Sequence, residues 1–221
     1  MRALAGLLVL VPLLCAAQGQ LPVERPHVKV GDRWTYQRMN YDAGKPTSTY
    51  EMQVVFADRG MIQVVSTQKL KEEEVDTTYT GDWNAVSTAA RVFYPHTGWF
   101  KFPLQVGDSY KAAYETVIPK QSIKARNERQ VTVVGWEDVV VPAGKFRALK
   151  IVSDGRFQRV EPSSVSGSSR NVIWYVPAIK RWAKITLENR PDGAAGMSKS
   201  KGKGKGRGEY SGEELVEYKV Q

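Results

Sequence analysis

The side chains of this 221-residue sequence that could do chemistry are acids, aromatic residues and one basic run. Two His and one Cys are too few to indicate a transition-metal site or a nucleophilic triad. Neighbouring acids such as Glu137 and Asp138 could serve a glycosidase, but a chain with 23 acidic residues offers many such pairs. We therefore expect no cofactor, no metal ion and no enzymatic activity.

The aromatic residues are the first candidates for binding. Because side chains alternate along a strand, Trp174 and Tyr175 must point to opposite faces, and we expect Trp174 to be the buried one. Either the aromatic side chains fill the core, where burial of each contributes about 2 to 3 kcal/mol, or they form a concave surface for a lipid or a protein segment. The residues of this possible ligand face are Trp34, Tyr36, Trp99, Trp136, Trp174 and Trp182.

The second candidate is a basic run between Ser198 and Gly208, in which Lys or Arg alternates with Ser or Gly. It has no apolar residue to bury, so we predict a disordered loop over about 190–212. An anionic membrane surface is the partner that this charge favours, at about 1 kcal/mol per basic residue. A solubilising insertion without a partner is the alternative, and nucleic acid is the least expected partner of an exported protein. The basic residues are Lys199, Lys201, Lys203, Lys205 and Arg207.

The elements that must position these side chains follow a targeting segment. Residues 1–2 carry a positive charge, and residues 3–14 form an uninterrupted apolar run that ends before small residues. The run is shorter than the roughly 20 residues of a membrane-spanning helix and is typical of a secretory signal peptide. We predict a signal peptide over 1–19 and a single periplasmic or secreted domain over 20–221. Cys15 leaves a lipid anchor as the less expected alternative, because Leu14 is larger than the residue that usually precedes a lipidated Cys.

From residue 34 onward the apolar pattern has a period of two, as in Tyr50, Met52 and Val54, which indicates half-buried strands. Turn residues at 58–60 and 142–144 predict hairpins, and Pro177 predicts the end of a strand. Only 82–92 has helical spacing. We predict a mainly β fold made of a strongly curved antiparallel sheet, either a half-barrel or barrel-like, with at most one or two short helices.

Two similar turns, 28–32 and 104–108, each place Gly-Asp before an aromatic strand. This repetition indicates either an internal duplication or the same hairpin chemistry used twice, and we favour the second interpretation.

Four phrases occur in a characteristic order: Val-Gly-Asp-Arg-Trp at 30–34, Phe-Pro-Leu at 102–104, Val-Pro-Ala-Gly-Lys-Phe at 141–146 and Trp-Tyr-Val-Pro at 174–177. Together they resemble a family of exported bacterial proteins known as domain of unknown function 3108. The resemblance extends over about 28–187, and the basic stretch 189–212 departs from it. It implies a curved antiparallel sheet like the half-barrel of periplasmic lipoprotein carriers, and it implies neither an established activity nor catalytic residues.

These observations predict a non-enzymatic exported binding or accessory protein of the cell envelope. One alternative is a periplasmic carrier of a lipophilic ligand or lipoprotein, which requires an open apolar cavity. Another is an enzyme of unrecognised type that acts on glycans, which requires two carboxylates facing each other across a cleft. The expected partners are a lipophilic ligand or an envelope protein.

Overall fold

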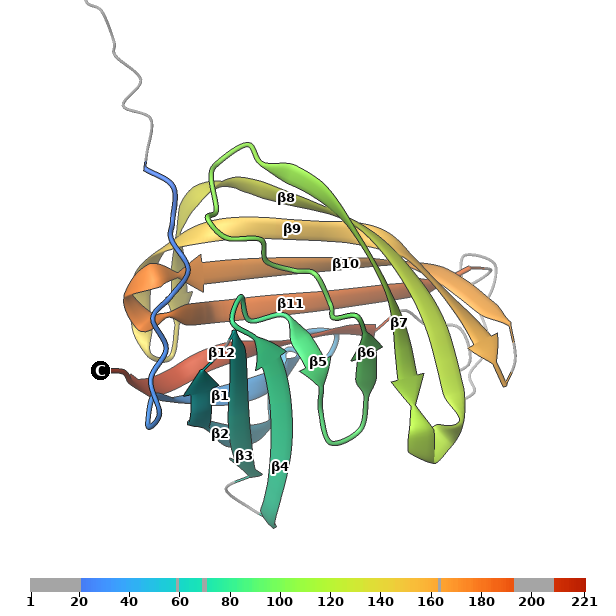
Figure 1. Cartoon of the computed structure of the whole chain (residues 1–221), viewed down its shortest axis with the longest axis horizontal. Helices are drawn as coiled ribbons and strands as arrows, with labels where there is room; N and C mark the ends of the chain where they lie inside the picture. Colours follow the sequence, from blue (N-terminus) through green and yellow to red (C-terminus); the bar gives the residue numbers. More distant parts are fainter. Residues whose placement is uncertain (1–20, 59, 69–70, 163, 193–208) are drawn as a thin grey trace, which may run out of the picture.

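The structure, a computed structural model, describes residues 21–58, 60–68, 71–162, 164–192 and 209–221. Its strands form one closed antiparallel barrel with the order β1-β12-β11-β10-β9-β8-β7-β6-β5-β4-β3-β2 around the wall (Figure 1). The strands are β1 (Arg33–Asn40), β2 (Lys45–Asp58), β3 (Met61–Gln68), β4 (Lys71–Thr80), β5 (Ala85–Ser87), β6 (Val92–Tyr94), β7 (Ser109–Ile118), β8 (Ile123–Val141), β9 (Gly144–Glu161), β10 (Val165–Val176), β11 (Arg181–Pro191) and β12 (Glu209–Lys219).

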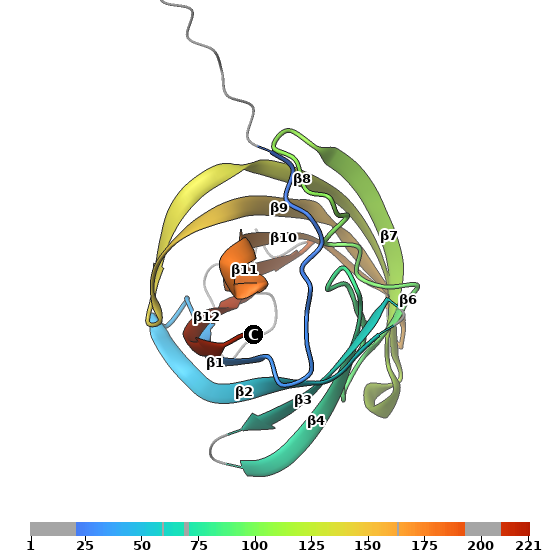
Figure 2. The same cartoon turned by 60° about the vertical axis from the view of Figure 1, so that its left-hand side comes forward.

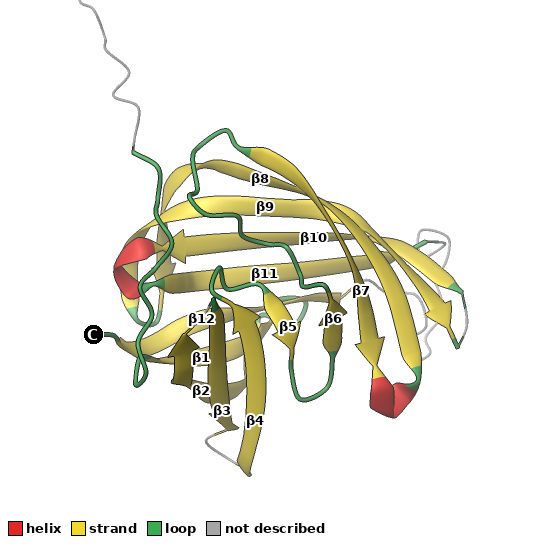
Figure 3. Cartoon of the chain, in the orientation of Figure 1, coloured by secondary structure: helices red, strands yellow, loops and turns green. Residues whose placement is uncertain are grey.

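The predicted fold class is confirmed, since the described chain is almost entirely antiparallel strand (Figure 3). The helical elements of the described residues are two single 3-10 turns, η1 (Pro119–Gln121) and η2 (Pro177–Ile179). The predicted hairpins at 58–60 and 142–144 join β2 to β3 and β8 to β9. Strand β10 ends at Val176 because Pro177, which has no amide hydrogen to continue the ladder, begins η2.

The helical spacing at 82–92 was a wrong indication, because this segment forms a turn and then β5. Trp83 has a positive φ of 62° and its side chain is completely buried. The amide of Asn84 then pairs with the backbone of Phe100, donating to its carbonyl oxygen at 2.8 Å and accepting from its N–H at 2.9 Å. This side-chain pairing takes the place of helical hydrogen bonds.

The two ends of the barrel differ. The N-terminal segment 21–32 crosses one end, where η2 also lies (Figure 2), and we call this the closed end. Val23 and Leu104 exchange two backbone hydrogen bonds of 2.8 Å there, so the β6–β7 connection is tied to the N-terminal segment. The β1–β2 and β7–β8 connections, the end of β11 and the start of β12 lie at the opposite end, which we call the open end.

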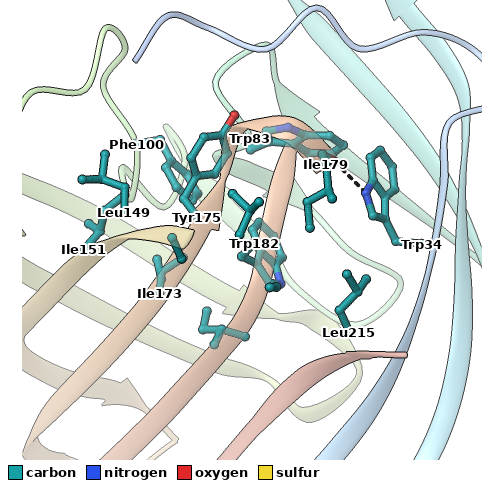
Figure 4. Close-up of a cluster of buried hydrophobic side chains, with 14 of the residues drawn as sticks. Trp34, Trp83, Phe100, Leu149, Ile151, Ile173, Tyr175, Ile179, Trp182 and Leu215 are labelled. Carbon is teal, nitrogen blue, oxygen red and sulfur yellow. Dashed lines mark hydrogen bonds between the residues drawn. The ribbon is translucent and has the colours of Figure 1, made fainter. Parts of the chain in front are cut away.

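Aromatic side chains fill the closed end (Figure 4). Their polar atoms donate to the backbone at and after η2: Trp34 Nε1 to the Ile179 oxygen at 2.9 Å and Trp83 Nε1 to the Lys180 oxygen at 2.8 Å. Phe100 stacks on Trp182 with ring centroids 6.2 Å apart. These rings therefore join strands, turn and loop into one packed core. The indole N–H groups of Trp34 and Trp83 are hydrogen-bonded in it, whereas Trp182 Nε1 is buried without a partner.

Arg181 is completely buried inside this aromatic cluster. Its Nη2 donates to the Tyr79 hydroxyl at 3.1 Å, and it forms no ion pair with a carboxylate of the described residues. Rings surround its Cζ at short distances: 3.8 Å to the centroid of Trp182, 4.2 Å to Trp83, 5.0 Å to Tyr79, 5.5 Å to Trp34 and 6.0 Å to Tyr36. Cation–π attraction and the bond to Tyr79 therefore offset part of the cost of burying this charge.

Two Gly-Asp turns precede β1 and β7 and have the same hydrogen bonds. Gly31 and Gly107 both have positive φ, 91° and 95°. In each turn the aspartate accepts from the backbone N–H three residues earlier, at 2.9 Å for Asp32 and 3.2 Å for Asp108. Each turn also exchanges two backbone bonds with the next strand, through Val54 or Val133. The turns differ in burial, since Asp32 is completely buried and Asp108 is exposed.

Burial raises the pKa of several tyrosine hydroxyls above the ordinary value of 10.0, because the phenolate form is poorly solvated inside the protein. The unfolded chain releases these protons near pH 10, whereas the folded barrel retains them. Stability is therefore fully present below pH 10 and falls as the pH rises above it. The tyrosines concerned are Tyr36, Tyr41, Tyr50, Tyr110 and Tyr175.

We expect an absorbance titration of the 10 tyrosines to show a late group that ionises only together with loss of the β-sheet circular dichroism signal. Ionisation of all the tyrosines in one step near pH 10, with the sheet signal intact, would contradict this prediction.

Candidate ligand-binding site

The lumen face of β8 to β12 changes from apolar to polar toward the open end. Residues paired directly across these strands form layers on this face, and Ser153 marks the change. The deepest of three layers contains Val133, Ile151, Ile173, Ile185 and Glu213; the next contains Val131, Ser153, Asn171, Leu187 and Ser211; the third contains Arg129, Gly155, Ser169, Asn189 and Glu209. Side chains alternate between faces, so these layers lie one above another along the lumen.

Arg129 is buried in the third layer, with 8% of its surface exposed. Its Nη1 donates to the Ser169 carbonyl oxygen at 3.2 Å, while its Nε has no hydrogen-bond partner. A Cβ at Gly155 would lie 2.6 Å from Arg129 Cδ, so the arginine side chain crosses the space that this glycine leaves. Within the described residues, no carboxylate forms an ion pair with Arg129.

Two serines beside Arg129 are also buried without a partner for their hydroxyl groups. Ser153 is 0% exposed and Ser169 is 4% exposed, and neither Oγ has a hydrogen bond. The buried Asn171 is paired directly with Ser153 across β9 and β10. Nearly all buried polar groups in folded proteins have a partner, so three unpartnered polar atoms in adjoining layers make this patch a candidate for binding. Other unpartnered atoms, Tyr175 Oη, Arg181 Nε and Nη1 and Trp182 Nε1, lie inside the packed closed end, away from the pocket described next.

A pocket of about 300 Å³ opens beside this polar patch. Leu187 lines the pocket and is paired directly with Asn171, so the patch and the pocket share a wall. The pocket residues are Arg38, Met39, Asn40, Thr47, Leu187, Glu209, Ser211, Gly212 and Glu213. We refer to the patch of Arg129, Ser153, Ser169 and Asn171, together with this pocket, as the open-end site.

The charges on the two sides of the open-end site differ. On the pocket side, Arg38 is paired with Glu213 across β1 and β12, and its Cζ lies 4.6 Å from the ring centroid of Tyr50. Burial and then the Glu213 carboxylate raise the pKa of Tyr50. The Glu213 carboxylate therefore lies close to Arg38 and Tyr50, on the pocket side of the site. On the other side, Arg129 has no anionic partner among the side chains that the structure describes.

The aromatic residues of the possible ligand face do not lie on one surface. Trp34, Tyr36 and Trp182 are buried in the closed end, whereas Trp99 and Trp136 are half-buried beside the core.

The structure corrects the burial prediction for Trp174. Tyr175 is 0% exposed on the lumen face, and Trp174 is half-buried on the outer face, where its Nε1 donates to Glu137 Oε1 at 2.5 Å. The lumen face of β10 is the one that carries Ser169, Asn171 and Ile173, and Tyr175 continues it. Val176 is buried as well, so two consecutive residues are buried at the end of β10. Alternation within the sequence therefore could not show whether Trp174 or Tyr175 faces the lumen.

Sequence reasoning missed Arg129 and its serine neighbours. The alternation of side chains along the strand could have revealed them. Arg129 lies two residues before Val131 and four before Val133, both buried, so a charged residue occupies a core-facing position of the strand. The basic residues from Lys199 to Arg207 lie outside the described residues. Within the described residues no group of three His, Cys, Asp or Glu side chains could hold a metal ion, and no helix is long and apolar enough to cross a membrane.

No family model matches this chain, and no curated protein matches it in sequence. Its fold is similar to that of a candidate exported protein with a YmcC-like fold from Bacteroides fragilis, with a TM-score of 0.51 and 16% identity over 90% of this chain and 100% of that one. A candidate lipoprotein from Parabacteroides distasonis gives a TM-score of 0.50 and 12% identity over the same shares of the two chains. At these identities the likeness shows the fold alone.

Proposed function

We propose that this chain is a non-enzymatic binding protein of the bacterial cell envelope and that its ligand enters the barrel through the open end. The observation that carries the proposal is the set of three buried polar atoms without partners, Arg129 Nε, Ser153 Oγ and Ser169 Oγ, beside a pocket. An unsatisfied buried polar group costs about 1 to 3 kcal/mol. A ligand that completes these hydrogen bonds would offset that cost.

The packing of the closed end favours this site over the apolar cavity that a carrier of a purely lipophilic ligand would need. Trp34, Trp83, Phe100 and Trp182 pack against one another there, so the rings serve as a core. The accessible part of the lumen is polar on the Arg129 side and mixed in the pocket. A ligand with a polar group and a small apolar part fits this distribution.

The glycan-enzyme alternative gains no support from the pocket acids. Glu209 and Glu213 both line the pocket, but they lie four residues apart on one strand, which separates their Cα atoms by about 13 Å. They therefore do not face each other across a cleft in the way that a pair of glycosidase carboxylates does.

Three features support the envelope location. Residues 3–14 have the pattern of a signal-peptide apolar region. Four phrases of the sequence resemble domain of unknown function 3108, a family of exported proteins, although no family model matches the chain. The fold is similar to that of a candidate exported protein and a candidate lipoprotein. We propose a mature domain that begins near residue 20 and acts in the periplasm or outside the cell.

The test is native mass spectrometry of protein purified from the cell envelope without denaturation. We expect a small-molecule adduct on the wild-type protein and its loss in Ser211→Trp, because a Trp side chain at Ser211 would occupy the pocket. Tyr210→Trp is the matched control, since it changes the neighbouring, exposed residue of the same strand. Absence of an adduct from the wild-type protein, or an equal adduct on Ser211→Trp, would contradict the proposal.

A further inference from the structure

We propose that the open-end site recognises an oxyanion, a carboxylate or phosphate group of the ligand, through the guanidinium of Arg129. This inference rests on the proposed binding function and adds the chemical class of the ligand. It goes beyond the pocket itself, because the recognition group lies on β8 and the patch around it lies on β9 and β10.

One edge of the Arg129 guanidinium is already used and the other is free. Nη1 donates to the Ser169 carbonyl oxygen, which fixes the orientation of the group. Nε is buried without a partner, and Nη2 forms no hydrogen bond with the described residues. The Nε and Nη2 hydrogens point in parallel, and this is the fork that binds two oxygens of a carboxylate or a phosphate.

A comparison with Arg181 shows why the missing partner of Arg129 should be an anion. Both arginines are buried and neither has a carboxylate partner within the described residues. Arg181 has five aromatic rings around its Cζ, whereas the described ring contacts include none for Arg129. The fold thus compensates one buried cation internally and leaves the other for a ligand.

The two serines can complete the coordination of such a group. Ser169 is paired with Gly155, which is paired with Arg129, and Ser153 lies one layer deeper on β9. Diagonal neighbours on a sheet face are about 7 to 8 Å apart, which a bound oxyanion with its substituent can bridge. Both hydroxyls are unpartnered donors, and a carboxylate or phosphate has oxygens left after the guanidinium fork is satisfied.

The layer below this patch indicates what accompanies the oxyanion. Ile151 and Ile173 lie directly beneath Ser153 and Asn171, and Leu187 adjoins them in the pocket. We therefore test the inference with probes that join an oxyanion to a short alkyl chain. Octanoate and octyl phosphate separate the two oxyanion sources, and octanamide is the uncharged isostere of octanoate.

Isothermal titration calorimetry at constant ionic strength measures the binding of each probe. We expect the wild-type protein to bind octanoate or octyl phosphate at least tenfold more tightly than octanamide, and the tighter of the two identifies the oxyanion. Arg129→Leu should remove this preference, so that the charged and uncharged probes bind with similar affinity. Arg126→Leu is the matched control, because it removes the same charge from the outer face of the same strand and should keep the preference.

A thermal unfolding measurement excludes a merely structural role. Arg129→Leu should unfold at the same temperature as the wild type or higher, because it removes a buried cation without an anionic partner. A lower unfolding temperature, or undiminished oxyanion preference in Arg129→Leu, would overturn the inference. Equal binding of all three probes that is lost in Ser211→Trp would overturn the oxyanion inference alone, whereas probe binding that Ser211→Trp leaves intact would overturn the proposed site.

Discussion

Replacement of Asp32 by alanine should lower the free energy of unfolding by about 3 to 5 kcal/mol, because the variant loses a completely buried carboxylate and leaves its three hydrogen-bond donors without an acceptor. The Asp32 carboxylate is completely buried. Its Oδ2 accepts from Lys180 Nζ at 2.9 Å and from the Lys29 N–H at 2.9 Å, and its Oδ1 accepts from the Gln221 N–H at 2.8 Å. One side chain thus holds the first turn, η2 and the C-terminal strand together. Urea unfolding followed by tryptophan fluorescence measures the loss.

The second Gly-Asp turn provides the matched control. Asp108 accepts the same turn hydrogen bond, from the Gln105 N–H, but its side chain is exposed and forms no ion pair in the described residues. Asp108→Ala should therefore cost about 1 kcal/mol or less. If the two variants lost equal stability, the turn geometry and not the buried charge would be responsible.

Replacement of Arg181 by alanine should lower the free energy of unfolding by about 3 to 5 kcal/mol. The side chain is completely buried among aromatic rings, so its truncation leaves a cavity that rigid indoles cannot close. Arg181→Met keeps much of the volume and removes the buried charge, and we expect a loss of less than about 1.5 kcal/mol. Denaturant unfolding of both variants measures the two contributions separately.

The comparison between the two variants is decisive for the role of the charge. The Arg181 Nε and Nη1 have no hydrogen-bond partner, so the guanidinium is incompletely satisfied and the methionine should be tolerated. A methionine variant as unstable as the alanine variant would show instead that cation–π attraction dominates at this position.

Local features of the fold could be predicted from the sequence, and the closure of the barrel could not. Strand alternation and the turns at 58–60 and 142–144 depend on residues that are neighbours in the sequence, so the local sequence pattern predicts them. The pairing of β1 with β12 joins opposite ends of the chain, and no local pattern encodes it. For the same reason the similar Gly-Asp phrases predicted similar turns, but only the structure shows that Asp32 lies against Lys180 and Gln221.

The open-end site was missed because its members are ordinary residues made unusual by their register. Two serines, an asparagine and an arginine on three strands form no sequence motif. Arg129 is notable only because its Nε has no hydrogen-bond partner, and this can be seen only in the folded structure. We predicted a ligand face from the aromatic residues because such residues are common at binding surfaces. In this fold several of them are needed to close one end of the barrel, where they pack on η2.

The pairing of β1 with β12 also determines when the protein can finish folding. The last contact of the C-terminal strand with the first turn, between Gln221 and Asp32, joins residues 189 positions apart. Contacts of such large sequence separation make folding slow, because the entropy of loop closure is lost before the contacts form. Until β12 arrives, β1 and β11 both expose unpaired strand edges, which invite pairing with other chains. A chain synthesised from its N-terminus therefore keeps both of these edges unpaired until β12 has been made.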